Sequence, residues 1–146
     1  MHQMNSAPVT GDIDVDPRAL RQWTLVSGLE WRAVCEGHYN LLLEGPEAST
    51  NAALLLLKPH LPGIVHWKQS TARLELPPPD VRTLILENVD NLAATQQTNL
   101  LTWVAAGDKR MQIVSTTTQP LFPFVARGLF DERLYYRLNT VFLHID

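Results

Sequence analysis

The sequence predicts an α/β fold in which a parallel sheet of about five strands lies between layers of helices. Short apolar runs alternate with helical patterns along most of the chain. Several of these runs are apolar at successive positions, which is typical of strands buried on both faces. The chain has 146 residues, of which 45% are hydrophobic, so one domain with a substantial core is expected. Right-handed crossovers would connect its strands.

The N-terminal part of the chain combines a polar tail with two expected helices. Residues 1–16 are polar and predict a flexible tail. Asp16 is a suitable N-cap, and the proline that follows it favours a helix over 17–28. A second short helix is expected at 29–36. The single globular domain would then comprise residues 17–146.

The central part of the chain begins with a strand, a helix and another strand. The strand is expected at Leu41–Leu43, the helix at 47–58 and the next strand at Gly63–Trp67. The segment TARLEL, residues 71–76, alternates with period two, which leaves a short strand and an extended connection both open. A stronger strand is expected at Val81–Val89, after a proline-rich break.

The second half of the chain continues the alternation of helices and strands. A helix is expected with Asn91 or the preceding Asp90 near its N-cap and with Gly107 past its end. Met111–Thr118 is the next apolar strand. The remaining expected elements are a short helix within 120–128, a helix at Phe130–Leu138 and a strand at Thr140–Ile145.

Composition excludes several classes of protein. The net charge of −3 argues against direct DNA binding, which needs clustered Lys and Arg to neutralise phosphates. No apolar run approaches the roughly 18 residues that span a bilayer, and the N-terminus lacks the features of a secretory signal. Cys35 is the sole cysteine, so a reducing cytoplasmic location is expected. The five histidines show no metal-ligand spacing, and we expect no metal.

One segment, LLLEGPEASTNAALLLL, has the strand–turn–helix arrangement that holds phosphate in many proteins. Such a loop directs backbone N–H groups at the anion, and glycines permit the necessary dihedral angles. Here Gly45 is the one glycine, and the segment contains no lysine. The segment alone therefore leaves a nucleotide site, a lost site and a chance resemblance open.

Three segments together resemble the ATPase domain of sigma-54-dependent bacterial transcription activators, a branch of the AAA+ proteins. They are LLLEGPEASTNAALLL, TLILENVDNLAATQQTNLLTWV and IVSTTTQPLFPFVARGLFDERLYYRLNTVFLHI. Within the third, GLFDERLYYRLN is close to the family pattern G-x-F-R-x-D-L-Y-Y-R-L-N. The resemblance covers about residues 17–146 and implies a three-layer P-loop NTPase-like core without a lid domain.

The family's nucleotide-site motifs have changed in this chain. The phosphate loop G-E-x-G-T-G-K-E falls on residues 45–52, where Gly45 remains and Asn51 replaces the lysine. The family's Asp-Glu pair, which binds magnesium and activates the attacking water, falls on Glu87 and Asn88. The sensor asparagine falls on Thr118. The resemblance thus implies a vestigial nucleotide site at Gly45, Asn51 and Glu87.

The family's subunit-contact helix is better preserved. Of two arginines that reach into a neighbouring subunit's site, the first falls on Asp131 and the second on Arg137. Arg137 is open to two interpretations: surface charge paired with nearby acids, or an inter-subunit contact. The resemblance implies an interface at Arg137, Tyr135 and Phe130.

The segment between the phosphate loop and the Asp-Glu strand is short. Only 35 residues separate Asn51 from Glu87, and they contain no counterpart of the family's sigma-contacting motif G-A-F-T-G-A. We therefore expect no sigma-contacting loop of the family type.

Chemistry at the vestigial site argues against tight nucleotide binding. Pro46 removes one donor, Glu47 adds a negative charge, and Asn51 cannot replace an ammonium group. Loss of one charged hydrogen bond worth about 1.5–3 kcal/mol weakens binding by about ten- to 150-fold. We expect no cofactor, with ATP and Mg²⁺ relevant only if the loop binds them in an unorthodox way. Glu87 is either a magnesium ligand or a hydrogen-bonded acid at a strand end.

Three functions are compatible with these observations. The favoured hypothesis is a non-catalytic module in transcription regulation that contacts a protein partner, either AAA+ activator subunits or a second copy of itself, and so antagonises a ring-forming activator. The second is a weak ATP binder or ATPase. The third is a receiver-like scaffold, although a receiver's paired acids and lysine are missing from the expected positions.

Overall fold

The structure is a computed structural model that describes residues 36–146, except 72, 79 and 108–109. The five strands among these residues run parallel in one sheet, in the order β2-β3-β4-β1-β5. They are β1 (Leu41–Glu44), β2 (Val65–Gln69), β3 (Thr83–Glu87), β4 (Gln112–Thr117) and β5 (Val141–His144). The expected tail 1–16 and helix 17–28 lie outside the described residues, as does all but the last residue of the helix expected at 29–36.

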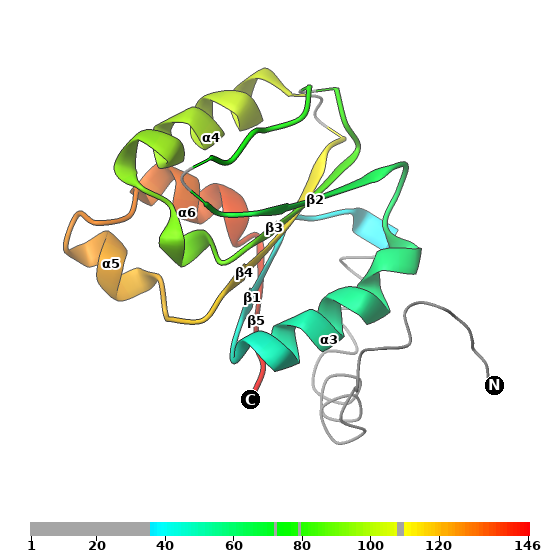
Figure 1. Ribbon diagram of the computed structural model, residues 1–146, viewed down its shortest axis with the longest axis horizontal. Coiled ribbons are helices and arrows are strands. Elements are labelled where there is room, and N and C mark those ends of the chain that lie inside the picture. The colour runs from blue at the N-terminus through cyan, green and yellow to red at the C-terminus, as the bar shows by residue number, and fades with distance from the viewer. Residues whose placement is uncertain (1–35, 72, 79, 108–109) are drawn as a thin grey trace.

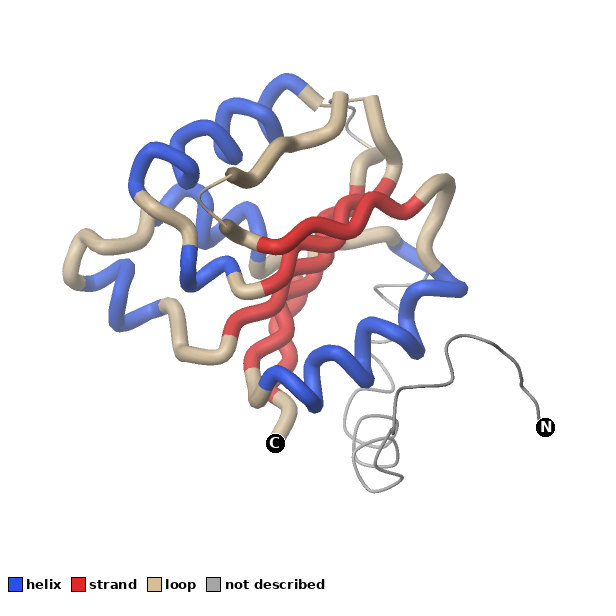
Figure 2. The backbone as a smooth tube through the Cα atoms, viewed as in Figure 1, coloured by secondary structure: helices blue, strands red, loops and turns tan. Residues whose placement is uncertain are grey.

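Four α-helices are described, together with two short 3₁₀ turns. The helices are α3 (Glu47–Leu57), α4 (Ala94–Ala106), α5 (Phe122–Ala126) and α6 (Glu132–Leu138). The 3₁₀ turns are η1 (Lys58–His60) and η2 (Val89–Asn91). Figure 1 and Figure 2 show α3 on one face of the sheet and α4, α5 and α6 on the other.

Alternation of buried side chains along each strand separates two apolar cores. Leu41 and Leu43 of β1 pack with Leu54 and Leu57 of α3 on one face. Leu42, between them, packs in the other core, together with residues of α4 and α6. The three-layer architecture expected from the sequence is therefore confirmed, since the strands are covered on both sides.

The element order matches the expectation, whereas several boundaries differ. Each described strand is confirmed within one to two residues of the expected start, and β3 ends at Glu87 rather than Val89. Residues 74–78 pair in no strand, which selects the extended connection for the TARLEL segment. Trp103 Nε1 of α4 donates to the carbonyl oxygen of Pro77 at 2.6 Å and holds this connection against the helix.

The expected start of the long helix was wrong. Helix α4 begins at Ala94, and its N-cap, Ala93, makes no side-chain capping hydrogen bond. Asn88 adopts a left-handed conformation (φ 59°, ψ 52°) that leads into η2. Val89 and Leu92 are then buried in the core, at 0% and 5% exposure. Burial of these two apolar side chains outweighs the local capping preference of Asp90 and Asn91.

The C-terminal ends of the strands place the candidate site. Because all strands are parallel, β1, β3 and β4 end at the same edge of the sheet. Glu44, Glu87 and Thr117 are the last residues of these strands. The positions that resemble a nucleotide site therefore do lie along one edge.

Candidate functional site

The turn between β1 and α3 is short. Only Gly45 and Pro46 separate the strand from the helix, which starts at Glu47. Ser49 N–H and Thr50 N–H both donate to the Pro46 carbonyl oxygen at 3.0 Å. These amides cannot at the same time serve an anion, and Pro46 has no N–H.

Asn51, at the position of the missing lysine, lies within α3. The whole stretch Glu47–Asn51 is helical, although a phosphate loop would require most of it to be an open turn. Glu47 lies in the first turn, where its charge suits the helix dipole and opposes a phosphate. Apolar burial of Ala53, Leu54 and Leu57 fixes the helix in this register.

Gly45 is required by a close backbone contact. A Cβ atom added at Gly45 would lie 2.1 Å from the carbonyl oxygen of Ile145, far inside van der Waals contact. Gly45 N–H donates to the Thr117 carbonyl oxygen at 3.0 Å, and Ser49 Oγ donates to the Asp146 carbonyl oxygen at 3.0 Å. The chain after β5 therefore packs against the turn where a phosphate would sit.

Glu87 is buried at 5% exposure and is bonded within the protein. Its Oε2 accepts hydrogen bonds from Trp67 Nε1 and from Gln69 Nε2, the latter at 2.6 Å. Both donors lie on β2, and Gln69 is the direct register partner of Glu87. Glu87 is thus a hydrogen-bonded acid at the end of β3, and a role for it in binding magnesium stays a prediction.

Asn88 links three elements of the edge. Its backbone N–H donates to Thr116 Oγ1 at 2.9 Å. Its side-chain amide lies 3.3 Å from Glu47 Oε2 and 3.5 Å from Gln69 Oε1, as a donor to both. An amide that donates to a carboxylate in this way is not a general base for an attacking water.

Thr118, at the sensor position, is also bonded within the protein. Its hydroxyl donates to Asp90 Oδ2 at 3.0 Å, which joins the end of β4 to η2. Thr118 and Asp90 thus lie beside the same edge as Glu87 and Glu44. The side chains of Glu87, Asn88 and Thr118 are therefore bonded to other protein groups along this edge, whereas Asn51 lies within α3.

His144 adds a pair of contacts that the sequence did not suggest. Its Nδ1 lies 2.8 Å from Glu44 Oε2, and its Nε2 lies 3.2 Å from Asp146 Oδ1. The hydrogen bond to Glu44 raises the pKa of His144 above its usual value, and the bond to Asp146 raises it further. This contact could not be found from the sequence because it depends on the parallel pairing of Glu44 with His144. Neither residue lies in a recognisable motif.

The first of the two subunit-contact positions has become a helix cap. Asp131 Oδ1 accepts from Arg133 N–H at 2.8 Å and from Leu134 N–H at 3.2 Å, so it caps α6. The Arg133 guanidinium bonds the same carboxylate at 3.0 Å and lowers the pKa of Asp131. Asp131, one of the acids near Arg137 in the sequence, is thus paired with Arg133.

The three expected interface residues occupy different environments. Phe130 is 3% exposed and belongs to the core formed with α4, so it supports the surface without contributing to it. Tyr135 is half-buried, whereas Tyr136 is 58% exposed. Arg137 is exposed on the last turn of α6, and its carbonyl oxygen accepts from Asn40 Nδ2 at 2.8 Å.

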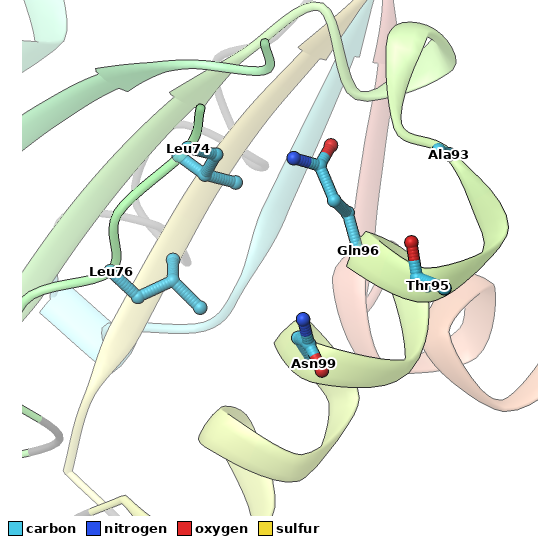
Figure 3. Close-up of a pocket in the computed structure, with 6 residues that line it drawn as sticks. All are labelled: Leu74, Leu76, Ala93, Thr95, Gln96 and Asn99. Carbon is cyan, nitrogen blue, oxygen red and sulfur yellow. The ribbon is translucent and has the colours of Figure 1, made fainter. Parts of the chain in front are cut away.

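A separate pocket of about 350 Å³ lies between the extended connection and α4. Figure 3 shows Leu74 and Leu76 on one side and Gln96 and Asn99 on the other. Gln96 Nε2 donates to the Thr71 carbonyl oxygen at 2.7 Å. The lining residues are Leu74, Leu76, Ala93, Thr95, Gln96 and Asn99, all uncharged. Among the described residues that line it, the pocket therefore has no acid, base or phosphate-binding cation.

Metal binding and membrane insertion find no support in the part of the chain that the structure describes. Within it, no group of three or more His, Cys, Asp or Glu side chains is placed to hold a metal ion. No helix among the same residues is long and apolar enough to cross a bilayer.

Comparison with known families identifies the group to which this sequence is related. The model of the sigma-54 interaction domain matches residues 68–146, more than half of the chain. The chain belongs to the sigma-54 interaction domain family. The matched region includes β3, α4, β4, α6 and β5, and therefore includes Glu87 and Arg137 but not the turn at Gly45. A search of curated proteins found no match.

Solved structures with the same fold include members of this family. NtrX from Brucella abortus, crystallised with ATP, is 17% identical with a TM-score of 0.59, over 92% of this chain and 36% of that one. The P-loop NTPase domain of a sigma-54 activator from E. coli is 15% identical with a TM-score of 0.58, over 85% and 94%. RuvB from Thermotoga maritima is 14% identical with a TM-score of 0.57, over 86% and 45%.

These similarities show that the sheet and its helices form the P-loop NTPase fold of AAA+ proteins. At such low identity they establish the fold and carry no information on activity. The chain spans about a third of the length of the NtrX chain that it matches. The expected fold and family are both confirmed.

Proposed function

We propose that this chain is a non-catalytic member of the sigma-54 interaction domain family that acts in transcription regulation by protein contact. The observation that carries the proposal is the start of α3 at Glu47, directly after a two-residue turn. It leaves the residues that would surround a phosphate in helical conformation. The chain would then keep the family's framework for contact without its chemistry.

The residues present do not fit a magnesium–nucleotide complex. Gly45 faces the Ile145 carbonyl oxygen instead of an open hollow, and Asn51 offers no positive charge. Glu87 Oε2 already accepts two N–H donors, so a metal ion at that oxygen would compete with Trp67 and Gln69. Asn88 donates where an attacking water would need an acceptor. We therefore derive no catalytic step for this chain.

The proposed partner is a subunit of a ring-forming AAA+ activator, and the proposed effect is antagonism. The exposed part of α6 with Tyr136 and Arg137 supports a contact role. Between Asn51 and Glu87 the chain has no sigma-contacting motif, so an inserted copy would interrupt the ring's action on its target. It would lower activation instead of causing it.

Titration into the purified ATPase domain of a sigma-54 activator tests this role. We expect the chain to bind with a Kd below about 100 µM, and to lower ATP hydrolysis as it enters the assembly. Arg137→Glu should weaken both effects, whereas Arg73→Glu, which reverses an exposed charge on the extended connection, should change neither. Absence of binding and of any effect on hydrolysis would contradict the proposal.

The second candidate is a weak ATP-binding protein. It is favoured by one feature, the acid that remains at the end of β3 as Glu87. Isothermal titration calorimetry with Mg²⁺ and ATP separates the two candidates. Saturable heat at a Kd tighter than about 1 mM would support the second candidate and remove the first.

A further inference from the structure

Strand β2 is an edge of the sheet, and one side of its backbone is open. Among the described strands it pairs with β3 alone. Ser70, directly after β2, donates its N–H to the Glu87 carbonyl oxygen at 3.0 Å. Because alternate residues of a strand direct their backbone groups to the same side, Val65 and Trp67 direct their N–H and C=O groups away from β3. In the part of the chain that the structure describes, neither makes a backbone hydrogen bond outside the sheet.

The side chains of β2 alternate between two faces of different chemistry. Val65 and Trp67 pack against the core on the α3 side, and we call them the apolar face of β2. His66 and Lys68 lie on the opposite side of the sheet, and we call them the basic face. Both are partly exposed, and no ion pair among the described residues involves either of them. Lys58 adds positive charge nearby, with its Nζ 5.6 Å from the centre of the Trp67 ring.

The opposite edge of the sheet differs in charge. It is formed by β5, where Glu44 Oε2 lies 2.8 Å and Asp146 Oδ1 lies 3.2 Å from the two ring nitrogens of His144. These two carboxylates would repel an acidic strand. Of the two edges, charge therefore favours β2 as the one that binds an acidic extended segment.

One segment of this chain has the complementary pattern. Residues 12–16, which lie outside the described residues, read DIDVD and alternate aspartate with β-branched side chains. In an extended chain successive side chains point to opposite faces, so Ile13 and Val15 would share one face and the three aspartates the other. When the two apolar side chains lie beside the apolar face of β2, the aspartates lie beside its basic face.

The length of the chain permits this pairing within one molecule. A strand added beside β2 would lie four strand spacings from β1, which is roughly 19 Å. Residues 17–35 connect the segment to the described part of the chain, and they would span about 28 Å even if all were helical. The segment can therefore reach the open edge of β2.

We propose that residues 12–16 bind the open edge of β2 in the same chain as an additional strand. Backbone hydrogen bonds would join the segment to Val65 and Trp67, and the aspartates would pair with the basic face. The segment would cover an edge that is otherwise a template for pairing with other chains. The inference is independent of the proposed function, because it involves neither α6 nor an activator.

Amide hydrogen exchange of the full chain, followed by NMR, tests the pairing. The Trp67 N–H should exchange at least about tenfold more slowly in the unaltered chain than in a variant with Asp12→Lys and Asp14→Lys. A variant with His66→Glu and Lys68→Glu should lose the same protection. Combining all four substitutions should restore it, because the charges are then reversed on both sides of the contact.

Three controls accompany these variants. The Ser70 N–H, which bonds Glu87 within the sheet, should stay protected in every variant and so report an intact fold. Arg73→Glu and Glu36→Lys reverse exposed charges outside β2 and the segment, and they should leave the exchange of Trp67 unchanged. Raised ionic strength should speed that exchange in the unaltered chain, because the paired charges are partly exposed.

Three outcomes would overturn the inference. The first is a Trp67 N–H that exchanges rapidly in the unaltered chain. The second is equal protection of this N–H in the unaltered chain and in the Asp12→Lys, Asp14→Lys variant. The third is protection that rises with protein concentration, which would assign the bound segment to a second copy. None of these outcomes bears on activator binding, so the proposed function stands or fails separately.

Discussion

The polar side chains around the turn at Gly45 and those on the surface of α5 and α6 lie in different surroundings. Around Gly45 the side chains of Glu87, Asn88 and Thr118 are bonded to other protein groups. On α6 the exposed Tyr136 and Arg137 keep their side chains at the surface. Under the proposed function, the first region serves the fold and the second serves binding. Substitutions should therefore affect stability at the first and association at the second.

The core beneath α6 provides the largest expected effect. Leu134 is fully buried between α4 and α6, so Leu134→Ala should lower the free energy of unfolding by about 2–5 kcal/mol. Tyr136→Ala, two residues away and exposed, should change it by no more than about 0.5 kcal/mol. Urea denaturation of both variants measures the contrast. Similar losses in the free energy of unfolding for Leu134→Ala and Tyr136→Ala would mean that the Tyr136 side chain packs in the core.

Gly45→Ala tests whether the turn is closed. The added methyl would meet the Ile145 carbonyl oxygen, and we expect a loss of about 1–3 kcal/mol in the free energy of unfolding. Thermal and urea denaturation measure this loss. Unchanged stability would show that the chain after β5 does not pack against the turn, and that the hollow is open.

Asp131→Ala should have a smaller effect that depends on pH. Loss of the helix cap should cost about 0.5–2 kcal/mol near neutral pH. Because the pKa of Asp131 is lowered in the folded state, its charge stabilises the fold above its ordinary pKa of 3.8. That stabilisation is lost as the pH falls through the folded-state pKa. The difference between the variant and the unaltered chain should therefore shrink in acid, as measured by denaturation at pH 7 and pH 3. A constant difference would assign the effect to packing.

His144→Gln should have the smallest effect, with the opposite pH dependence. The pair with Glu44 is partly exposed, so its contribution is about 0.2–1 kcal/mol. Because the pKa of His144 is raised in the folded state, this contribution is fully present below the ordinary value of 6.5. It is lost as the pH rises through the folded-state pKa. Denaturation at about pH 5.5 and pH 9 should show a difference only at the lower pH.

The fold was predictable from the sequence because its signals are local. Continuous apolar runs such as Leu41–Leu43 identified the buried strands, and apolar helical stripes identified most helices. The start of α4 was not predictable in this way, because the burial of Val89 and Leu92 competes with local capping. The assignment of Phe130 to an interface illustrates the same limit, since its burial under α4 depends on tertiary packing.

The state of the candidate site was predictable only in part. Asn51, at the position of the family's lysine, is visible in the sequence, and the expected loss of phosphate affinity rests on it and stays a prediction. The partners of Glu87 were not visible, because the contact of Gln69 with Glu87 depends on the register of β2 and β3. The role of Asp131 as a helix cap was not recognised from the sequence, because Asp131 was considered only as the position that aligns with an arginine of the family.

Amide resonances of Gly45–Asn51 during titration with Mg²⁺ and ATP test the central claim most directly. A closed turn predicts that these resonances stay unchanged up to about 5 mM nucleotide, and that the amides of Ser49 and Thr50 remain protected by the Pro46 carbonyl oxygen. Saturable shifts of Gly45 and Ala48, accompanied by loss of protection at Ser49 and Thr50, would show that α3 opens to bind phosphate. That result would contradict the account of a closed nucleotide site.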